Sequence, residues 1–337
     1  AKAFRANGYV DRILDGMKLP DDYVAGFKRS LAKDLGNREG GLAWAMLGQH
    51  VDYVGFTELS DRRLPVFRVI TSEGFDYVMM LARVSENGNV QFDDIYTLSN
   101  SDWASRSAKR LIMPLIQADL KGRLNKYLSD EEDLEYLKHI EEIGQMTQAL
   151  HAGDTETFLK LHKGLPEEIQ KTRLMRGLLI AALPVEDERY LEEIRKVAKD
   201  FPEDGGVILL TIDLDVLEGN WEEAQRKVDL LEKIVGGDPY CNTLRGNIKI
   251  MEEDYEGGIS YLEKAVTDIP DLEDPVWALA AAYSATRKFT QARELYERLQ
   301  DEFDYEFVQQ DFMSEEDKAF RESEEGKTFL KTLPASR

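Results

Sequence analysis

The stretch GNWEEAQRKVDLLEKI (residues 219–234) decides the fold of the second half of the chain, because two later stretches repeat its pattern. These are EDYEGGISYLEKAV (253–266) and RKFTQARELYERL (287–299). Aligned on their aromatic residues, Trp221, Tyr255 and Phe289, successive copies lie 34 residues apart. Three further columns keep this step without a gap: Ala224, Gly258 and Ala292; Val228, Leu262 and Tyr296; Leu231, Ala265 and Leu299. The chain therefore repeats one structural unit.

The physical meaning of the pattern is a closely packed pair of helices. Apolar residues at three- and four-residue spacing predict amphipathic helices, and the small residue lets the second helix approach the first. The first helix of each pair has its own small position, occupied by Gly246 and Ala280. One pair cannot bury its apolar face alone, so neighbouring pairs are expected to stack.

A step of 34 residues with these columns resembles the tetratricopeptide repeat (TPR). The resemblance implies an all-α, TPR-like right-handed superhelix over 121–305, with its best units at 171–204, 205–238, 239–272 and 273–305. Residues 306–337 are expected to form an acidic C-terminal cap or tail. The layout also resembles a group of uncharacterised bacterial proteins with an N-terminal α+β domain followed by TPR repeats. The phrases GGDPYCNTLRGNIKIMEEDYEGG (236–258) and IPDLEDPVWALAAAY (269–283) carry that resemblance, which implies no activity.

Residues 1–120 predict a separate α+β domain, in which helices pack on an antiparallel meander sheet. Helical spacing marks two segments within residues 1–36, and a further helix is expected over 101–117. Runs rich in β-branched and aromatic residues predict strands at 50–59, 64–71, 75–84 and 90–98. The run 75–84 is apolar on both faces and is therefore expected at the centre of the sheet. The nuclear-transport-factor-2-like and cystatin-like folds are possible forms of such a domain.

The charge of the chain limits its partners. There are 43 Lys and Arg against 65 Asp and Glu, a formal net charge of −22, and almost all of the excess lies after residue 120. Such a chain should repel nucleic acid and anionic membranes. No apolar run reaches the length of about 20 residues that a membrane span needs, so no membrane insertion is expected. The single cysteine, Cys241, excludes an internal disulfide framework.

The resemblance to TPR proteins implies a partner-binding groove lined by the first helices. In that register the groove residues include Leu209 and six further candidates: Asp213, Thr243, Asn247, Met251, Trp277 and Ala281. Asn247 falls where some members of the family hold a peptide terminus, but Thr243 and Trp277 stand where the basic residues of a carboxylate clamp would be. An apolar or basic protein or peptide segment therefore suits the acidic groove better.

The α+β domain offers an alternative site. His50, Glu58, Asp93 and Asp94 could line a pocket for a small molecule or for weak hydrolysis, since helix-capped sheets often enclose cavities. Adjacent strand residues face opposite sides, so the preferred interpretation of the two aspartates is one exposed side chain and one that is hydrogen-bonded or capping. A metal shared by His151 and His162 is a further, weaker alternative. No catalytic, metal-binding or cofactor-binding motif is recognised, and no cofactor is expected.

These observations predict a non-enzymatic interaction or scaffold protein that binds a partner segment through its repeats. The alternative is a small-molecule-binding or weakly hydrolytic α+β domain with the repeats as an accessory module. In the first hypothesis the α+β domain either forms a homodimer or docks onto the first repeat. The compartment stays open between the cytoplasm and export with a removed leader, because the sequence begins at Ala1 without Met.

Overall fold

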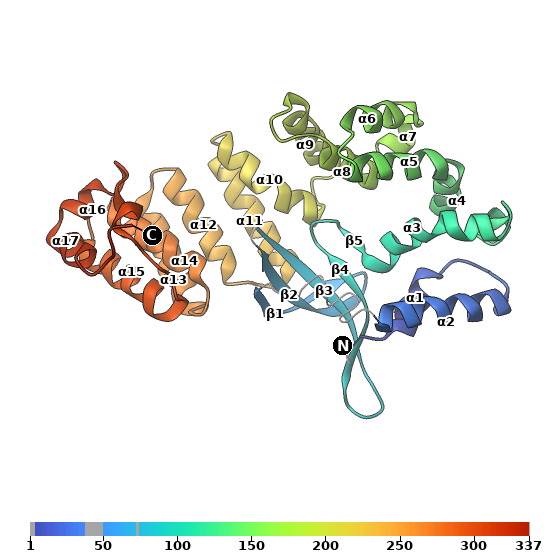
Figure 1. The fold of residues 1–337 in the computed structure, drawn as a ribbon, viewed down its shortest axis with the longest axis horizontal. Coiled ribbons are helices and arrows are strands. Elements are labelled where there is room, and N and C mark those ends of the chain that lie inside the picture. The colour runs from blue at the N-terminus through green and yellow to red at the C-terminus, as the bar shows by residue number, and fades with distance from the viewer. Residues whose placement is uncertain (1–3, 38–49, 72–73, 337) are drawn as a thin grey trace. The chain divides into compact units, whose positions relative to one another are not determined.

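The computed structural model describes residues 4–37, 50–71 and 74–336 (Figure 1). The chain falls into two compact units. The first unit is Ala1–Leu210 and the second is Thr211–Arg337. The division falls inside helix α10 (Gly205–Leu217), whereas the change of composition near residue 120 lies within the first unit.

An antiparallel meander sheet forms the strand-rich part of the first unit. Its strands are β1 (His50–Leu59), β2 (Arg62–Thr71), β3 (Gly74–Val84), β4 (Val90–Thr97) and β5 (Asp102–Trp103). They pair in the order β1-β2-β3-β4-β5. The four longer strands coincide with the four predicted runs, and β3 is central, as its two apolar faces indicate. Residues Tyr77 and Val78, which point to opposite faces of β3, are both buried.

Helices pack beside and against this sheet. They are α1 (Ala6–Ile13), α2 (Asp21–Asn37) and α3 (Ala104–Asp119), and both α1 and α3 contact β4. Val10 and Ile13 of α1 and Met113 and Ile116 of α3 are buried in one cluster. The amphipathic spacing of these helices therefore produces the core that joins them. An α+β arrangement followed by many helices is thus confirmed.

The rest of the first unit is helical. Its elements are the 3₁₀ turn η2 (Leu124–Lys126) and the helices α4 (Glu131–Lys138), α5 (Ile140–His151), α6 (Thr155–Gly164), α7 (Glu167–Gln170), α8 (Arg173–Ala182) and α9 (Glu188–Asp200). Carboxylate or hydroxyl side chains start several of them: Asp130, Asp154, Thr172 and Asp187 each accept a hydrogen bond from a backbone N–H of the first turn. Ile143, Phe158 and Met175 belong to one buried cluster that joins α5, α6 and α8.

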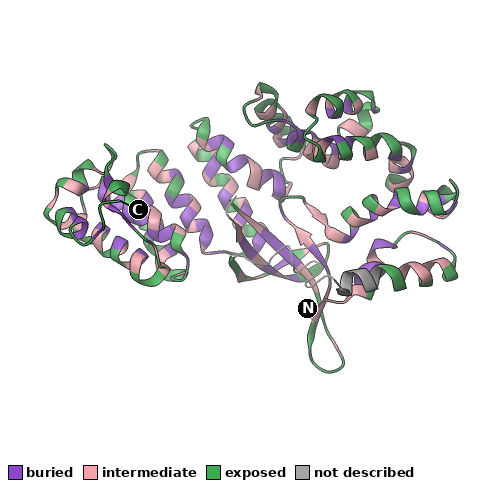
Figure 2. Ribbon diagram, viewed as in Figure 1, coloured by how far each residue is buried: buried purple, intermediate pink, exposed green. Residues whose placement is uncertain are grey.

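Helix pairs with a constant step fill the second unit. After α10 come α11 (Trp221–Val235), α12 (Tyr240–Met251), α13 (Tyr255–Asp268), α14 (Glu273–Ala285) and α15 (Phe289–Phe303). The second helices begin at Trp221, Tyr255 and Phe289, so the 34-residue step of the sequence is also the step of the structure. All nine residues of the three inner columns, from Ala224 to Leu299, are buried, and Figure 2 shows buried and exposed residues alternating around these helices.

The small residues of the repeat lie where α12 and α13 meet. A Cβ atom at Gly246 would stand 2.6 Å from Leu262 Cγ and 3.2 Å from the carbonyl oxygen of Gly258. A Cβ atom at Gly258 would in turn stand 2.6 Å from Ile250 Cδ1 and 3.0 Å from the carbonyl oxygen of Gly246. The two glycines therefore face each other and allow the two helix backbones to approach closely.

The C-terminal segment packs on the last helix pair. It contains η3 (Gln309–Phe312), α16 (Lys318–Glu322) and α17 (Glu324–Leu330). Four of its phenylalanines are buried with Tyr296 of α15: Phe307, Phe312, Phe320 and Phe329. The segment thus covers the apolar side that α14 and α15 leave open, as a terminal cap is expected to do.

Among the described residues, none of the helices combines the length and the apolar character that crossing a membrane requires.

The glycine contact gives a stability prediction. Gly246→Ala should lower the free energy of unfolding by about 1–3 kcal/mol, because the added methyl group collides with Leu262 and with backbone that cannot move freely. Gly144→Ala is the matched control: this mid-helix glycine of α5 has nothing within 4 Å of its Cβ position, so alanine should be neutral or stabilise by up to about 1 kcal/mol. Urea unfolding followed by circular dichroism measures both. Equal effects of the two changes would contradict the close approach.

Candidate binding cleft and exposed helix ridge

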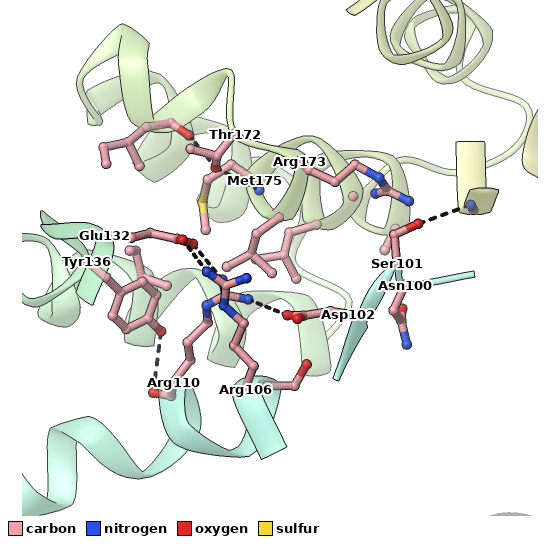
Figure 3. A pocket seen from close by; sticks show the side chains of 18 of the residues that line it. Asn100, Ser101, Asp102, Arg106, Arg110, Glu132, Tyr136, Thr172, Arg173 and Met175 are labelled. Atoms are coloured by element: carbon pink, nitrogen blue, oxygen red, sulfur yellow. Dashed lines mark hydrogen bonds and ion pairs between the residues drawn. The ribbon is translucent and has the colours of Figure 1, made fainter. Parts of the chain in front are cut away.

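A cleft of about 1060 Å³ lies in the first unit (Figure 3). Its walls come from the loop and strand before α3, from α3 itself, from α4, from the α7–α8 region and from the start of α10. A volume of this size is at the upper end of what small-molecule sites use. It also suits a short stretch of polypeptide.

Two arginines of α3 form one side of the cleft. Arg106 and Arg110 are four residues apart, so the helix places them on one face. Arg110 donates to Asp102 Oδ2 and to Glu132 Oε1, both over 2.8 Å, and Arg106 is also paired with Glu132. Figure 3 shows the two guanidinium groups together at Glu132. Both positive charges are therefore already matched by carboxylates.

A second group of polar contacts joins the loop before β5 to the start of α10. Ser101 Oγ donates to Asp204 Oδ1 over 2.6 Å and accepts from the backbone N–H of Gly206 over 3.1 Å. Asp204 also accepts from the N–H of Val207, within the first turn of α10. Arg173 donates to the carbonyl oxygen of Ser99 over 3.2 Å. These contacts fix the far end of the cleft, where Gly206 lies against the backbone of residues 98 and 99 and has no room for a side chain.

The remaining lining is apolar or acidic. Apolar side chains of four helices, α5, α7, α8 and α10, contribute: Ile143, Ile169, Leu174, Leu178, Leu209 and Leu210. Of the charged residues in the lining, six are Asp or Glu and three are Arg. An apolar ligand with neutral or basic polar groups therefore fits this cleft better than an anion does.

The structure does not bring the predicted pocket residues of the α+β domain together. His50 and Glu58 lie on β1, whereas Asp93 and Asp94 lie on β4, and β2 and β3 run between them. Three interstrand spacings of about 4.8 Å separate the two strands by roughly 14 Å. His50 Nε2 instead pairs with Asp52 over 2.9 Å, and Glu58 is exposed.

Asp94 has a structural environment. Its side chain is fully buried and accepts from Ser105 Oγ (2.5 Å), from the N–H groups of Ser105 and Ile95 (3.0 Å each) and from Arg12 Nε (2.6 Å). It thereby links α1, β4 and the first turn of α3. Asp93 is partly exposed and pairs with Arg5 over 2.7 Å. Neither carboxylate lines the cleft, and this division of roles is the one that the strand alternation favours.

The predicted groove residues divide into two groups. Asp213, Asn247, Met251 and Ala281 are exposed on α10, α12 and α14. The other two candidates are packed: Thr243 is buried, and the half-buried Trp277 makes edge contacts with Tyr305 (4.9 Å) and Phe307 (5.2 Å) of the C-terminal segment. Trp277 therefore packs against the C-terminal segment of the chain itself. Leu209, the remaining predicted groove residue, lines the cleft of the first unit instead.

The exposed candidates belong to a larger repeating surface. Moving 34 residues back and forward from Met251 reaches Leu217 and Ala285, which are also exposed. Each of the first helices α10, α12 and α14 contributes two residues that are four positions apart. We call this set the first-helix ridge: Asp213, Leu217, Asn247, Met251, Ala281 and Ala285. Leu217 is 77% exposed and Met251 is 58% exposed, and α12 contacts α14 directly. Sequence reasoning missed Leu217 and Ala285, although the 34-residue step would have found them.

Asp213 is the charged member of the ridge. It makes no hydrogen bond or ion pair with any described residue, and the surrounding protein, by reducing its solvation, raises the pKa of its carboxyl above the ordinary value. More than a third of the residue is nevertheless open to solvent. A cationic group from outside the chain could therefore reach this carboxylate and stabilise its charge.

Among the described residues, no three His, Cys, Asp or Glu side chains come close enough together to hold a metal ion. His151 is exposed at the end of α5, whereas His162 is buried on α6, and Cys241 is buried in α12.

No protein-family model matches the chain, and no curated protein matches it.

The two aspartates of β4 give a paired prediction. Asp94→Asn should destabilise the protein by about 3 kcal/mol, because it removes the charge that Arg12 and Ser105 face in a buried position. Asp93→Asn should cost about 1 kcal/mol or less, since its partner Arg5 can turn to solvent. Urea or thermal unfolding measures both. A small effect at Asp94 would show that its contacts are not what holds α1 and α3 to β4.

Proposed function

We propose that the helix pairs of residues 205–303 are TPR-like units and that the protein is a non-enzymatic binding protein. It holds a segment of a protein or peptide along the first-helix ridge. The observation that carries the proposal is the exposure of Leu217 and Met251 at equivalent positions of consecutive units. Large apolar side chains at such exposure have a solvation cost that a partner can remove.

The chemistry of the ridge indicates the kind of partner. Leu217 and Met251 suit apolar side chains, and methionine adapts to different shapes. Asp213 offers an unpaired carboxylate, and the chain as a whole carries a formal charge of −22. A segment that combines apolar residues with Lys or Arg therefore fits best, with charge guiding its approach and orientation. Asn247 can donate and accept hydrogen bonds to the backbone of such a segment.

The constant step supports an extended partner. Because equivalent residues recur every 34 positions, the ridge presents the same two side-chain positions on α10, α12 and α14. A segment that runs across these helices could use each unit in turn, as in repeat proteins generally. The tail does not occupy this surface at Met251, which stays 58% exposed.

The cleft of the first unit supports a second candidate. Its volume of about 1060 Å³ and its apolar wall suit a small molecule or a short peptide, with the repeats as an accessory module. This candidate keeps the small-molecule alternative for the N-terminal region but uses a different site. The ligand would bind between α3, α4 and α8 and not at Asp93 and Asp94.

One experiment separates the two candidates. Peptides are selected from a displayed random library on the full protein, and their affinities are measured by fluorescence anisotropy. We expect the selected peptides to combine apolar residues with Lys or Arg. Met251→Glu and Leu217→Glu should each weaken them about tenfold or more, because each places a charge where an apolar side chain docks.

The controls use the same substitution elsewhere. Met313→Glu changes an exposed methionine outside the ridge, and the affinity should stay within about twofold, as for a surface change away from the site. Leu178→Glu introduces a charge into the apolar wall of the cleft. Loss of binding in Leu178→Glu but not in Met251→Glu would assign the peptide to the cleft and overturn the ridge. A library that yields no specific peptide would overturn both.

A further inference from the structure

A second hollow in the first unit has a different character. It measures about 500 Å³ and lies among α6, α7, α8 and α9. Its charged lining consists of five cations and two carboxylates: Lys163, Lys171, Arg176, Arg189 and Lys196, with Glu167 and Glu193. In a chain with 65 acidic and 43 basic residues, this local excess of positive charge reverses the general balance.

The hollow also contains an unsatisfied polar atom. His162 lines it, is only 8% exposed, and its Nε2 atom is buried without a hydrogen-bond partner. The Nε atom of Arg176 is likewise buried and unpartnered. Leaving such groups unpaired costs free energy that an added acceptor would recover. Burial lowers the pKa of His162, so near neutral pH the ring is uncharged and Nε2, in the tautomer that carries its proton, can donate.

The cations of the hollow differ in how firmly they are held. Arg176 is held between Glu193 (2.7 Å) and Asp200 (3.2 Å), whereas the exposed Arg189 pairs with Asp187 at the surface. Lys171 makes only an exposed pair with Glu167, and such pairs contribute little. The half-exposed Lys196 pairs with the exposed Glu192 and with the largely buried Glu193. Lys163 makes no ion pair with any described residue. The exposed Lys163 and Lys171 are therefore the cations most available to turn toward a ligand, and the buried His162 and the held Arg176 line the same hollow.

We propose that this hollow binds the phosphate group of a small organic phosphate monoester. A phosphate carries nearly two negative charges at neutral pH and has several acceptor oxygens, which matches the lysine ammonium groups and the buried nitrogen donors of the lining. The organic part would lie against the apolar lining, Leu159, Leu179 and Leu183. The site is separate from the first-helix ridge and does not depend on the function proposed above.

Binding of phenyl phosphate to the full protein tests the proposal, because its ring suits the apolar lining. The signals of the His162 ring nitrogens, observed by ¹H–¹⁵N NMR, should shift in a saturable way. Sodium chloride of the same ionic strength and benzenesulfonate, which has one charge, should leave them nearly unchanged. Lys163→Gln should weaken phenyl phosphate about tenfold through the loss of a charge-assisted contact.

Lys160→Gln is the matched control. It removes the same charge from the same helix, α6, but Lys160 is exposed and does not line the hollow. Its effect should stay within about twofold. Equal weakening by both lysine changes would show unspecific attraction of anions and overturn the proposal, as would an absence of saturable shifts at His162. A phosphoserine peptide that binds here while phenyl phosphate fails to compete would overturn the small-molecule assignment.

Discussion

A pair of amphipathic helices always leaves one apolar side uncovered, and this constraint shapes the second unit of the protein. Each pair covers the open side of the one before it, and the inner columns of the repeat are buried for that reason. The series can end only where something else covers the last pair. Here the C-terminal segment does so with four buried phenylalanines around Tyr296. The acidic tail of the sequence therefore contains a core element, in spite of its overall charge.

The same constraint determines which residues remain available to a partner. A residue on a first helix is exposed only if neither the paired helix nor the next unit nor the cap covers it. Met251 meets this condition, whereas Trp277 does not, because Tyr305 and Phe307 pack against it. Aromatic residues at groove positions often bind a partner. In the last unit of a series, however, the segment that caps the series can pack against them instead. The position of the unit decides between these roles.

In the first unit, buried charge is used to join elements. Asp94 accepts hydrogen bonds from α1, from its own strand and from the start of α3, and these contacts orient the helix whose arginines line the cleft. The Asp94 carboxylate therefore has a structural role and not the ligand-binding or hydrolytic role that its position in an apolar strand suggests. The hollow among α6 to α9 shows the opposite situation: its buried His162 nitrogen has no partner. An unsatisfied buried group distinguishes a possible ligand site from a structural ion pair.

The sequence by itself determined the strands, the helix pairs and the 34-residue step. These features depend on local periodicity and on small residues at fixed spacing, as with Gly246 and Gly258, and such patterns are visible without coordinates. The antiparallel order of the meander also followed from its short connections. Only the tertiary structure decided the sites. His50 and Asp93 belong to two strands that β2 and β3 separate. Leu178 and Arg110 line the same cleft although they are far apart in the chain, and the C-terminal segment packs against Trp277. The physical reason is that burial and side-chain contact depend on which distant segments pack together, and local periodicity does not specify that.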